Sequence, residues 1–299
     1  MTLPVWVVKG NEGKTLVVTA GVHGCEYIGV RAVQQLFEFV NPLTLKGNLI
    51  FLPLCNPTAF YCGIKEVVPE DGQNLNRAFP GQQEGSLSMQ LAYQLEKSIF
   101  PLADALIDLH SGDIHEGLTP LVFYPAVGRP QAIMQQSYAM ARCTKVPYLV
   151  PSGSINGLYG RATLCNVPSI LLEIGCMGAY TQEEITLCIQ SICSVMAYVQ
   201  EAHDGNKSPQ IKWEKPHYIV AEQEGFWHQS LSPNQFFQAG NTLGVLKDID
   251  DRILQVVKAK DDGVVLYYTR SLGVTKGSPL IAYGTVPTQI REPLNTRSE

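Results

Sequence analysis

The sequence lacks any concentration of positive charge. Its 299 residues include 22 lysines and arginines against 27 aspartates and glutamates, and the net charge is −5. Nucleic-acid binding is therefore not expected, because phosphate backbones are bound by clustered positive charge. The chain also lacks an apolar stretch long enough to span a bilayer, and its first residues lack the basic and apolar segments of a signal peptide. We expect a cytoplasmic protein that does not associate with membranes.

Paired cysteines are missing as well. The eight cysteines form no Cys-x-x-Cys motif, and the chain is long enough to bury a core without disulfides. We expect reduced, mostly buried thiols. Cys25 and Cys176 lie within segments that are interpreted below as functional, where a small apolar filler is the simpler interpretation of each.

Two patterns of hydrophobicity meet near residue 205. Before it, buried apolar runs alternate with amphipathic segments, which is typical of an α/β fold with a mainly parallel sheet flanked by helices. The expected strands are 16–20, 48–54, 105–109, 121–124 and 169–174. Helical spacing of apolar residues appears over 30–40 and 92–99, and a capping box, Thr181-Gln-Glu-Glu184, predicts a third helix.

After that point the pattern is one of short strands. Residues 204–209 indicate a linker, and glycine-punctuated segments follow at 218–221, 242–246, 253–257, 264–268 and 280–283. We therefore predict a catalytic domain over residues 1–205 and a small all-β domain over residues 206–299.

Candidate metal ligands stand where two expected strands end. His23-x-x-Glu26 follows the first strand, although alone it is a weak motif that a surface histidine and a helix-capping glutamate would also produce. His110 ends the 105–109 strand, and two histidines with one carboxylate make a catalytic zinc set that leaves a position for water. Asp108 either orients His110 or caps a neighbouring loop.

Two further segments suit catalysis and substrate binding. Glu173 interrupts an apolar run, and burial raises the pKa of a carboxyl group, which suits a general base; a structural glutamate with satisfied hydrogen bonds is the alternative. In the loop 71–81, Asn76 and Arg77 present an amide beside a guanidinium, a pair suited to a substrate carboxylate. Alone, that loop would be interpreted as a solvated turn.

These motifs occur in the order typical of one family. The chain resembles the succinylglutamate desuccinylase/aspartoacylase family, relatives of the zinc carboxypeptidases, in four motifs: His23-x-x-Glu26, Asn-Leu-Asn76-Arg77-x-Phe-Pro-Gly, Asp-Leu-His110-Ser-Gly and Leu-Glu173-Ile-Gly. The β region resembles the family's appended domain, which has barrel-sandwich character. It contains no Met-Lys-Met attachment signal, so a carrier role is not expected.

The resemblance implies a zinc-carboxypeptidase-like fold with one Zn²⁺ per chain. It implies the following roles: zinc ligands His23, Glu26 and His110, a catalytic base Glu173, and substrate-carboxylate contacts Asn76 and Arg77. It also implies that Arg161 binds substrate, although a surface arginine would fit the same position.

Two positions depart from the family pattern. Lys65 stands where family members usually place an arginine that polarises the scissile carbonyl, and lysine supplies the charge without the two-pronged geometry. Asp113 replaces a second glycine after His110-Ser-Gly. Near a metal it would disfavour an acidic substrate and receive a substrate ammonium; the alternative is a solvent-facing loop residue.

The expected reaction is hydrolysis of an N-acyl amino acid to a carboxylate and a free amine. Zinc would activate water, Glu173 would transfer the proton to the leaving nitrogen, and Lys65 would help to stabilise the oxyanion. A metallocarboxypeptidase acting on short or cell-wall peptides would use the same residues, and a non-catalytic zinc-binding relative is a third interpretation. The sequence identifies neither the acyl group nor the amino acid, and it leaves open whether the protein is a homo-oligomer.

Overall fold

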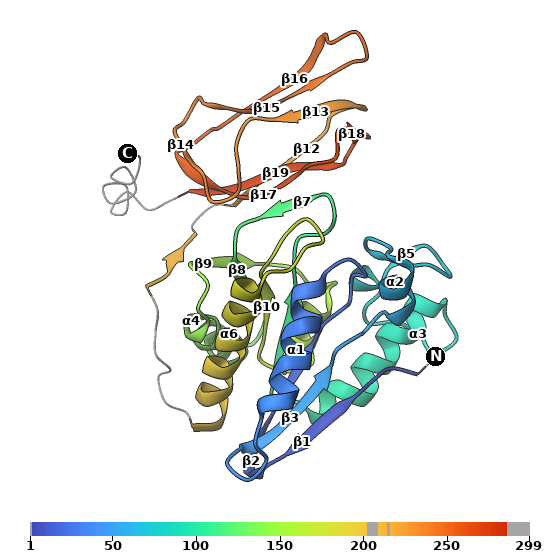
Figure 1. Ribbon diagram of the computed structural model, residues 1–299, viewed down its shortest axis with the longest axis vertical. Coiled ribbons are helices and arrows are strands. Elements are labelled where there is room, and N and C mark those ends of the chain that lie inside the picture. Colours follow the sequence, from blue (N-terminus) through green and yellow to red (C-terminus); the bar gives the residue numbers. More distant parts are fainter. Residues whose placement is uncertain (1, 202–208, 214–215, 286–299) are drawn as a thin grey trace.

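The computed structural model describes residues 2–201, 209–213 and 216–285. An eight-stranded sheet forms the centre of the larger part, in the order β1-β3-β2-β6-β10-β8-β9-β11 (Figure 1). Its strands are β1 (Trp6–Lys9), β2 (Asn11–Thr19), β3 (Lys46–Leu52), β6 (Ala105–His110), β8 (Leu121–Pro125), β9 (Tyr148–Ser152), β10 (Ser169–Glu173) and β11 (Ile211–Lys212). All five strands expected before residue 205 lie in this sheet.

The sheet is mainly parallel, with two antiparallel pairings that the sequence did not indicate. Strands β3, β2, β6 and β10 run parallel to one another, and the edge strand β1 pairs antiparallel with β3. Strand β8 was expected to join them, but it pairs antiparallel with β10 and parallel with β9. The chain between β6 and β8 contains no crossover helix, and without a crossover the returning strand runs the opposite way.

Helices cover both faces of the sheet. On one face lie α1 (Tyr27–Phe39), α4 (Gln131–Cys143) and α6 (Gln182–Glu201), which stand together in Figure 1. The other face packs against α3 (Leu87–Gln94), the wider π-helical turn Leu95–Ile99 that continues it, and α5 (Leu158–Leu164). The expected 92–99 helix is therefore divided between α3 and this turn.

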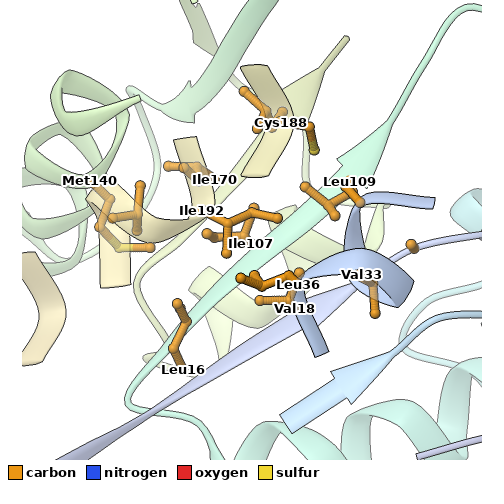
Figure 2. Packing of buried hydrophobic residues seen from close by; sticks show 14 of the residues in the cluster. Leu16, Val18, Val33, Leu36, Ile107, Leu109, Met140, Ile170, Cys188 and Ile192 are labelled. Carbon is orange, nitrogen blue, oxygen red and sulfur yellow. The ribbon is translucent and has the colours of Figure 1, made fainter. Parts of the chain in front are cut away.

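Alternation along the strands divides the core into two layers. In β6, Ile107 and Leu109 join the layer beneath α1, α4 and α6, whereas Leu106 joins the layer beneath α3 and α5. Figure 2 shows Ile107 and Leu109 beside residues of α1 and α6 such as Leu36 and Ile192. The same alternation decides which face receives the polar side chains of the strand ends.

The predicted capping box is present at the start of α6. Glu184 Oε2 accepts hydrogen bonds from the Thr181 amide (3.0 Å) and hydroxyl (2.9 Å), and the Glu184 amide donates to Thr181 Oγ1 (3.2 Å). The apolar face of the helix then buries Ile185 and Ile192 completely, as its spacing predicted.

The C-terminal part consists of two antiparallel sheets with a core of their own. One sheet contains β12 (Pro216–Val220), β19 (Pro279–Thr285), β17 (Gly263–Thr269) and β14 (Phe236–Phe237); the other contains β16 (Ile253–Lys258), β15 (Thr242–Lys247), β13 (Gly225–Gln229) and β18 (Gly273–Val274). Trp227, Leu243 and Tyr283 are fully buried in this core. Strands β13, β14 and β18 were not foreseen from the sequence.

Two short strands join the parts. β7 (Glu116–Leu118), which follows β6, pairs with β17, so the C-terminal sheets sit above the ends of β6 and β10 (Figure 1). β11, which lies beyond the boundary predicted at 205/206, pairs with β9 in the large sheet. Residues 204–208 of the expected linker lie outside the described residues, and the domain division stays a prediction.

Among the described residues, no helix is both long enough and apolar enough to cross a membrane.

Candidate active site

Polar residues gather at the carboxyl ends of three adjacent parallel strands. Thr19 of β2 is opposite Asp108 of β6, and Glu173 of β10 is opposite His110. Because Leu106 faces the α3 and α5 layer, Asp108 and His110 project from the same face. The ends of parallel strands are where α/β sheets collect their ligands, and the sheet order brings these side chains together there.

His23, Glu26 and His110 converge into one cluster. Glu26 Oε1 lies 2.5 Å from His23 Nδ1, and Oε2 lies 2.9 Å from His110 Nδ1. The Ser111 amide also donates to Glu26 Oε2, at 3.1 Å. Although Glu26 immediately precedes α1, its side chain makes no capping hydrogen bond. The helix-capping interpretation of Glu26 is therefore wrong, and the carboxylate is directed to the two imidazoles.

Asp108 supports the cluster from beneath. Its Oδ2 lies 3.2 Å from His110 Nε2, and its Oδ1 accepts a 2.8 Å hydrogen bond from the Thr19 hydroxyl. Asp108 is fully buried. These contacts agree with the interpretation that Asp108 orients His110, an arrangement that commonly accompanies metal-binding imidazoles.

The buried charges of the cluster stabilise one another. Burial raises the pKa of Glu26, but the two histidines outweigh that effect and hold it well below its usual range. Burial lowers the pKa of His110, but Glu26 and Asp108 raise it well above its usual value. For Glu173, burial raises the pKa to about 8, although His110 opposes the shift.

The donor set fits a zinc ion. One ligand atom from each of His23, Glu26 and His110 lies within 4.8 Å of the other two. Two imidazole nitrogens and one carboxylate oxygen are a common catalytic zinc set, and Asp108 supplies the usual outer support. The geometry therefore makes this cluster a candidate metal site.

A cavity of about 560 Å³ opens over the cluster. Lys65 and Asp113 both line it, and Lys65 Nζ lies 3.0 Å from Asp113 Oδ2. Asp113 is only 7% exposed, so the interpretation as a solvent-facing residue is wrong. Burial lowers the pKa of Lys65, but Asp113 outweighs it and raises the pKa above its usual value.

Asn76 and Arg77 reach the same cavity from the 3₁₀ turn Leu75–Arg77, which follows the short hairpin of β4 (Val67–Val68) and β5 (Gln73–Asn74). Asn76 Oδ1 accepts a 2.8 Å hydrogen bond from the Leu158 amide at the start of α5. Arg77 Nη1 donates to the Asn76 carbonyl at 3.1 Å. The structure thus brings the two residues together at one wall of the cavity.

A family model for the succinylglutamate desuccinylase/aspartoacylase catalytic domain matches residues 12–199, well over half of the chain. The chain belongs to this family. Its members are metal-dependent deacylases, and the cluster of His23, Glu26 and His110 is the candidate metal site of this chain.

Individual relatives agree with this assignment. The chain is 40% identical over 110 residues to the N-alpha-acetyl-L-2,4-diaminobutyric acid deacetylase of Halomonas elongata, a match that covers 37% of this chain and only 32% of that protein. The succinylglutamate desuccinylase/aspartoacylase structure from Rhodobacter sphaeroides is 25% identical, with a TM-score of 0.84 over 96% of this chain and 89% of that one. The product-bound ectoine utilization protein EutE (DoeB) of Ruegeria pomeroyi is 22% identical, with a TM-score of 0.85 over 95% and 89%, and shows the same fold.

Arg161 is the family-derived residue that the structure places elsewhere. Its Nε and Nη2 lie 2.7 and 3.1 Å from the two carboxylate oxygens of Glu96, and Arg161 is not among the residues that line the cavity. The π-helical turn that carries Glu96 covers the same face of the sheet as α5, and Arg161 pairs with Glu96 there. The expected substrate contact is therefore corrected to a structural ion pair.

Several residues of the cavity had no signal in the sequence. Glu116 lies on β7, and four more residues come from the C-terminal sheets and their connections: Tyr218, Tyr267, Ser278 and Pro279. None belongs to a recognisable motif. The pairing of β7 with β17, a contact between segments about 150 residues apart, brings the C-terminal sheets to the cavity.

Proposed function

We propose that this protein is a zinc-dependent hydrolase that removes the acyl group from an N-acyl amino acid by cleaving its linear amide bond. The observation that supports this most strongly is the donor cluster of His23, Glu26 and His110, in a cavity that Glu173 also lines. The name of the Halomonas elongata relative supports a small acylated amino acid as the substrate class.

His23, Glu26 and His110 would hold one zinc ion per chain. In a site with three protein ligands, zinc supplies a Lewis acid and lowers the pKa of bound water to about 7. Asp108 keeps His110 oriented through the 3.2 Å contact, and Thr19 in turn holds Asp108.

Glu173 is the proposed general base. Its strand neighbour is His110, so its carboxylate is next to the metal-ligand cluster, and it lines the cavity. It accepts a proton from the attacking water and delivers it to the amide nitrogen as the C–N bond breaks. The products are the free carboxylate and the free amine.

The remaining polar residues of the cavity bind and orient the substrate. Lys65, held by Asp113, places a positive charge where the carbonyl oxygen becomes negative. Arg77 supplies a guanidinium for the amino acid's own carboxylate, and Asn76 is fixed beside it by the Leu158 amide. Each of these roles is part of the proposal.

The test is the substitution Glu173→Gln, which removes the base and keeps the shape. We expect kcat to fall by about 10²- to 10⁴-fold while the zinc content, measured by elemental analysis, stays at one per chain. Activity is measured on a panel of N-acetyl and N-succinyl amino acids, with dipeptides as a comparison set.

The matched control is Glu66→Gln, which changes a second carboxylate of the same cavity. Its kcat should stay within about twofold of the parent, because nothing in the proposed chemistry uses it. A Glu173→Gln variant with full turnover would remove the base from the proposal. Hydrolysis confined to the dipeptides would favour a carboxypeptidase, and a zinc-loaded protein inactive on every compound would favour a non-catalytic role.

A further inference from the structure

A second cavity, of about 740 Å³, lies at the β11 end of the large sheet, which α4 covers (Figure 1). It shares no described lining residue with the catalytic cavity. Along β8, Phe123 lines the catalytic cavity and Tyr124 lines the second one; along β9, Ser152 and Pro151 divide in the same way. Because neighbouring side chains of a strand alternate, the two cavities lie on opposite faces of the same strands.

Two buried donors in the lining have no hydrogen-bond partner among the described residues. They are the Tyr124 hydroxyl and Trp213 Nε1, on residues that are 4% and 0% exposed. Burial raises the pKa of Tyr124 to about 12, and Tyr138 adds to the effect, so the hydroxyl keeps its proton at neutral pH. Buried donors are almost always hydrogen-bonded, and leaving one unpaired is costly. A ligand with an acceptor group would supply the missing partner.

The charge of the lining favours an anion. Lys212 of β11 is the one charged residue among the described lining residues, and its Nζ lies 5.6 Å from the centre of the Tyr138 ring. Gln131, the first residue of α4, also lines the cavity, and Pro130 before it provides no side-chain cap. The positive end of the helix dipole therefore adds to the charge of the lysine.

Much of the remaining surface is aromatic or apolar. The rings of Tyr124 and Tyr138 lie 5.1 Å apart, centre to centre, and Pro151 contributes a further apolar surface. Flat apolar side chains of this kind suit a flat apolar ligand. Gln131 and Gln135 line the cavity with exposed side chains that make no hydrogen bond to a described residue, so they can turn aside to admit it.

We propose that this second cavity binds a small aromatic carboxylate, a molecule other than the substrate of the proposed reaction. Its ring packs against the apolar lining. Its carboxylate accepts hydrogen bonds from the Tyr124 hydroxyl and Trp213 Nε1, with the Lys212 ammonium nearby. This inference does not depend on the proposed hydrolase function, because it concerns binding at a different cavity.

The experiment compares three probes that share one ring and differ in charge: phenylacetate, phenylacetamide and phenylethylamine. Each is titrated into the full-length, ¹⁵N-labelled protein while the indole N–H resonance of Trp213 is followed. We expect phenylacetate to shift this resonance saturably, with a Kd on the order of 1 mM for a ligand of this size. Phenylacetamide should bind about 10-fold more weakly, since charge strengthens a hydrogen bond, and phenylethylamine should not bind.

Trp227 provides an internal control. Its Nε1 is also buried without a partner among the described residues, but it belongs to the core of the C-terminal sheets and does not line the cavity. Its resonance should therefore not move. Substitution of each of the three tryptophans in turn by phenylalanine assigns the indole resonances.

Two substitutions test the residues of the cavity. Tyr124→Phe removes the hydroxyl and keeps the ring, and should weaken phenylacetate binding by about 10-fold. Lys212→Gln removes the charge, and should reduce the preference for phenylacetate over phenylacetamide by about fivefold. The matched controls are Tyr61→Phe, at an exposed tyrosine, and Lys9→Gln, on the edge strand β1 at the other end of the sheet. Both should leave the Kd unchanged.

The catalytic cavity also offers a cation to a carboxylate, so its contribution is measured separately. Arg77→Gln should leave the response of Trp213 to phenylacetate unchanged. A response that is lost in Arg77→Gln and kept in Lys212→Gln would place the anion in the catalytic cavity and overturn the inference. Equal affinity for the three probes, or no shift of the Trp213 resonance with phenylacetate, would overturn it as well. If a cavity variant fails to fold, the comparison of the three probes on the parent protein still decides.

Discussion

The large sheet and the C-terminal sheets line the same cavity with different kinds of side chain. Strand ends and loops of the α/β part contribute every ionisable group proposed to act on the amide bond, including His23, His110 and Glu173. The C-terminal sheets and their connections contribute two tyrosines, a serine and a proline, and no charged residue of the part described lines the cavity from that side. Under the proposed function, the α/β part performs the chemistry and the C-terminal sheets shape the space over it.

That division follows from how each part is built. Parallel strands end at a common edge, so side chains from β2, β6 and β10 meet there with little adjustment. Antiparallel sheets place their alternate side chains on a broad surface. Strand β7 connects the two, because it leaves the end of β6 and pairs with β17. Glu116 lies on this connecting strand and faces both kinds of wall.

The largest effect that we expect from the division between the α/β part and the C-terminal sheets comes from substituting one candidate metal ligand of the large sheet. His110→Ala removes one of three donors and leaves Asp108 buried without the imidazole that it supports. We expect zinc content well below one per chain and a loss of activity of about 10³-fold or more, because metal catalysis supplies several kcal/mol of transition-state stabilisation. Elemental analysis and steady-state kinetics measure the two effects.

His115→Ala is the matched control, since this exposed histidine is close in sequence but outside the cluster. It should retain both zinc and turnover. A His110→Ala protein that kept a full complement of zinc and normal kinetics would contradict the ligand assignment.

The sequence predicts those parts of the fold and the candidate site whose physical cause lies within a short segment of the chain. His23 and Glu26 are three residues apart on one turn, and His110 and Glu173 each stand at the end of an apolar strand, so short motifs identify them. The buried strands and the capping box of α6 were predicted for the same reason, and the structure confirms them. In each case the physical cause lies within a few residues of sequence.

Other features depend on contacts between distant segments. The direction of β8 is set by a connection that returns without a crossover helix, and apolar composition does not reveal it. Arg161 occurs in a segment that resembles a substrate-binding one, but its partner is decided by the position of Glu96, 65 residues away. Tyr267 and Glu116 meet the site through the β7–β17 pairing, which no local pattern encodes.

A second test, of smaller effect, addresses the wall formed by the C-terminal sheets. Tyr267→Ala removes an aromatic side chain from the cavity without touching a metal ligand. We expect KM to rise by about 10-fold, the equivalent of about 1.4 kcal/mol of lost contact, with kcat and zinc content changed far less. Tyr61→Ala, which truncates a tyrosine that is 78% exposed on α2 (Pro57–Cys62), is the control and should leave KM unchanged. A Tyr267→Ala variant that loses its zinc would show that the C-terminal sheets also support the metal site.

The smallest expected effect on activity concerns Arg161, where the contacts predict a change in stability alone. Arg161→Ala leaves the Glu96 carboxylate, which is 6% exposed, without its two-pronged partner. We expect the free energy of unfolding at pH 7 to fall by about 1–2 kcal/mol, a figure reduced for the partial exposure of the arginine, and KM to stay unchanged. Arg252→Ala removes an exposed pair with Asp250 and should change stability by less than about 0.5 kcal/mol.

The pH dependence of the stability difference between the parent and Arg161→Ala is a sharper test of the Arg161–Glu96 ion pair. Burial raises the pKa of Glu96, but Arg161 and Lys97 outweigh that effect and lower it below its ordinary value of 4.5. A carboxyl group whose pKa is lowered in the folded state contributes its full stability above the unfolded-state pKa, and loses it as the pH falls through the folded-state value. Urea unfolding should therefore show the gap between the parent and Arg161→Ala at pH 7, and the gap should close on acidification below about pH 4.5. A stability difference that is independent of pH would mean that Arg161 stabilises the protein by packing. A rise in the KM of Arg161→Ala would mean that Arg161 contacts the substrate.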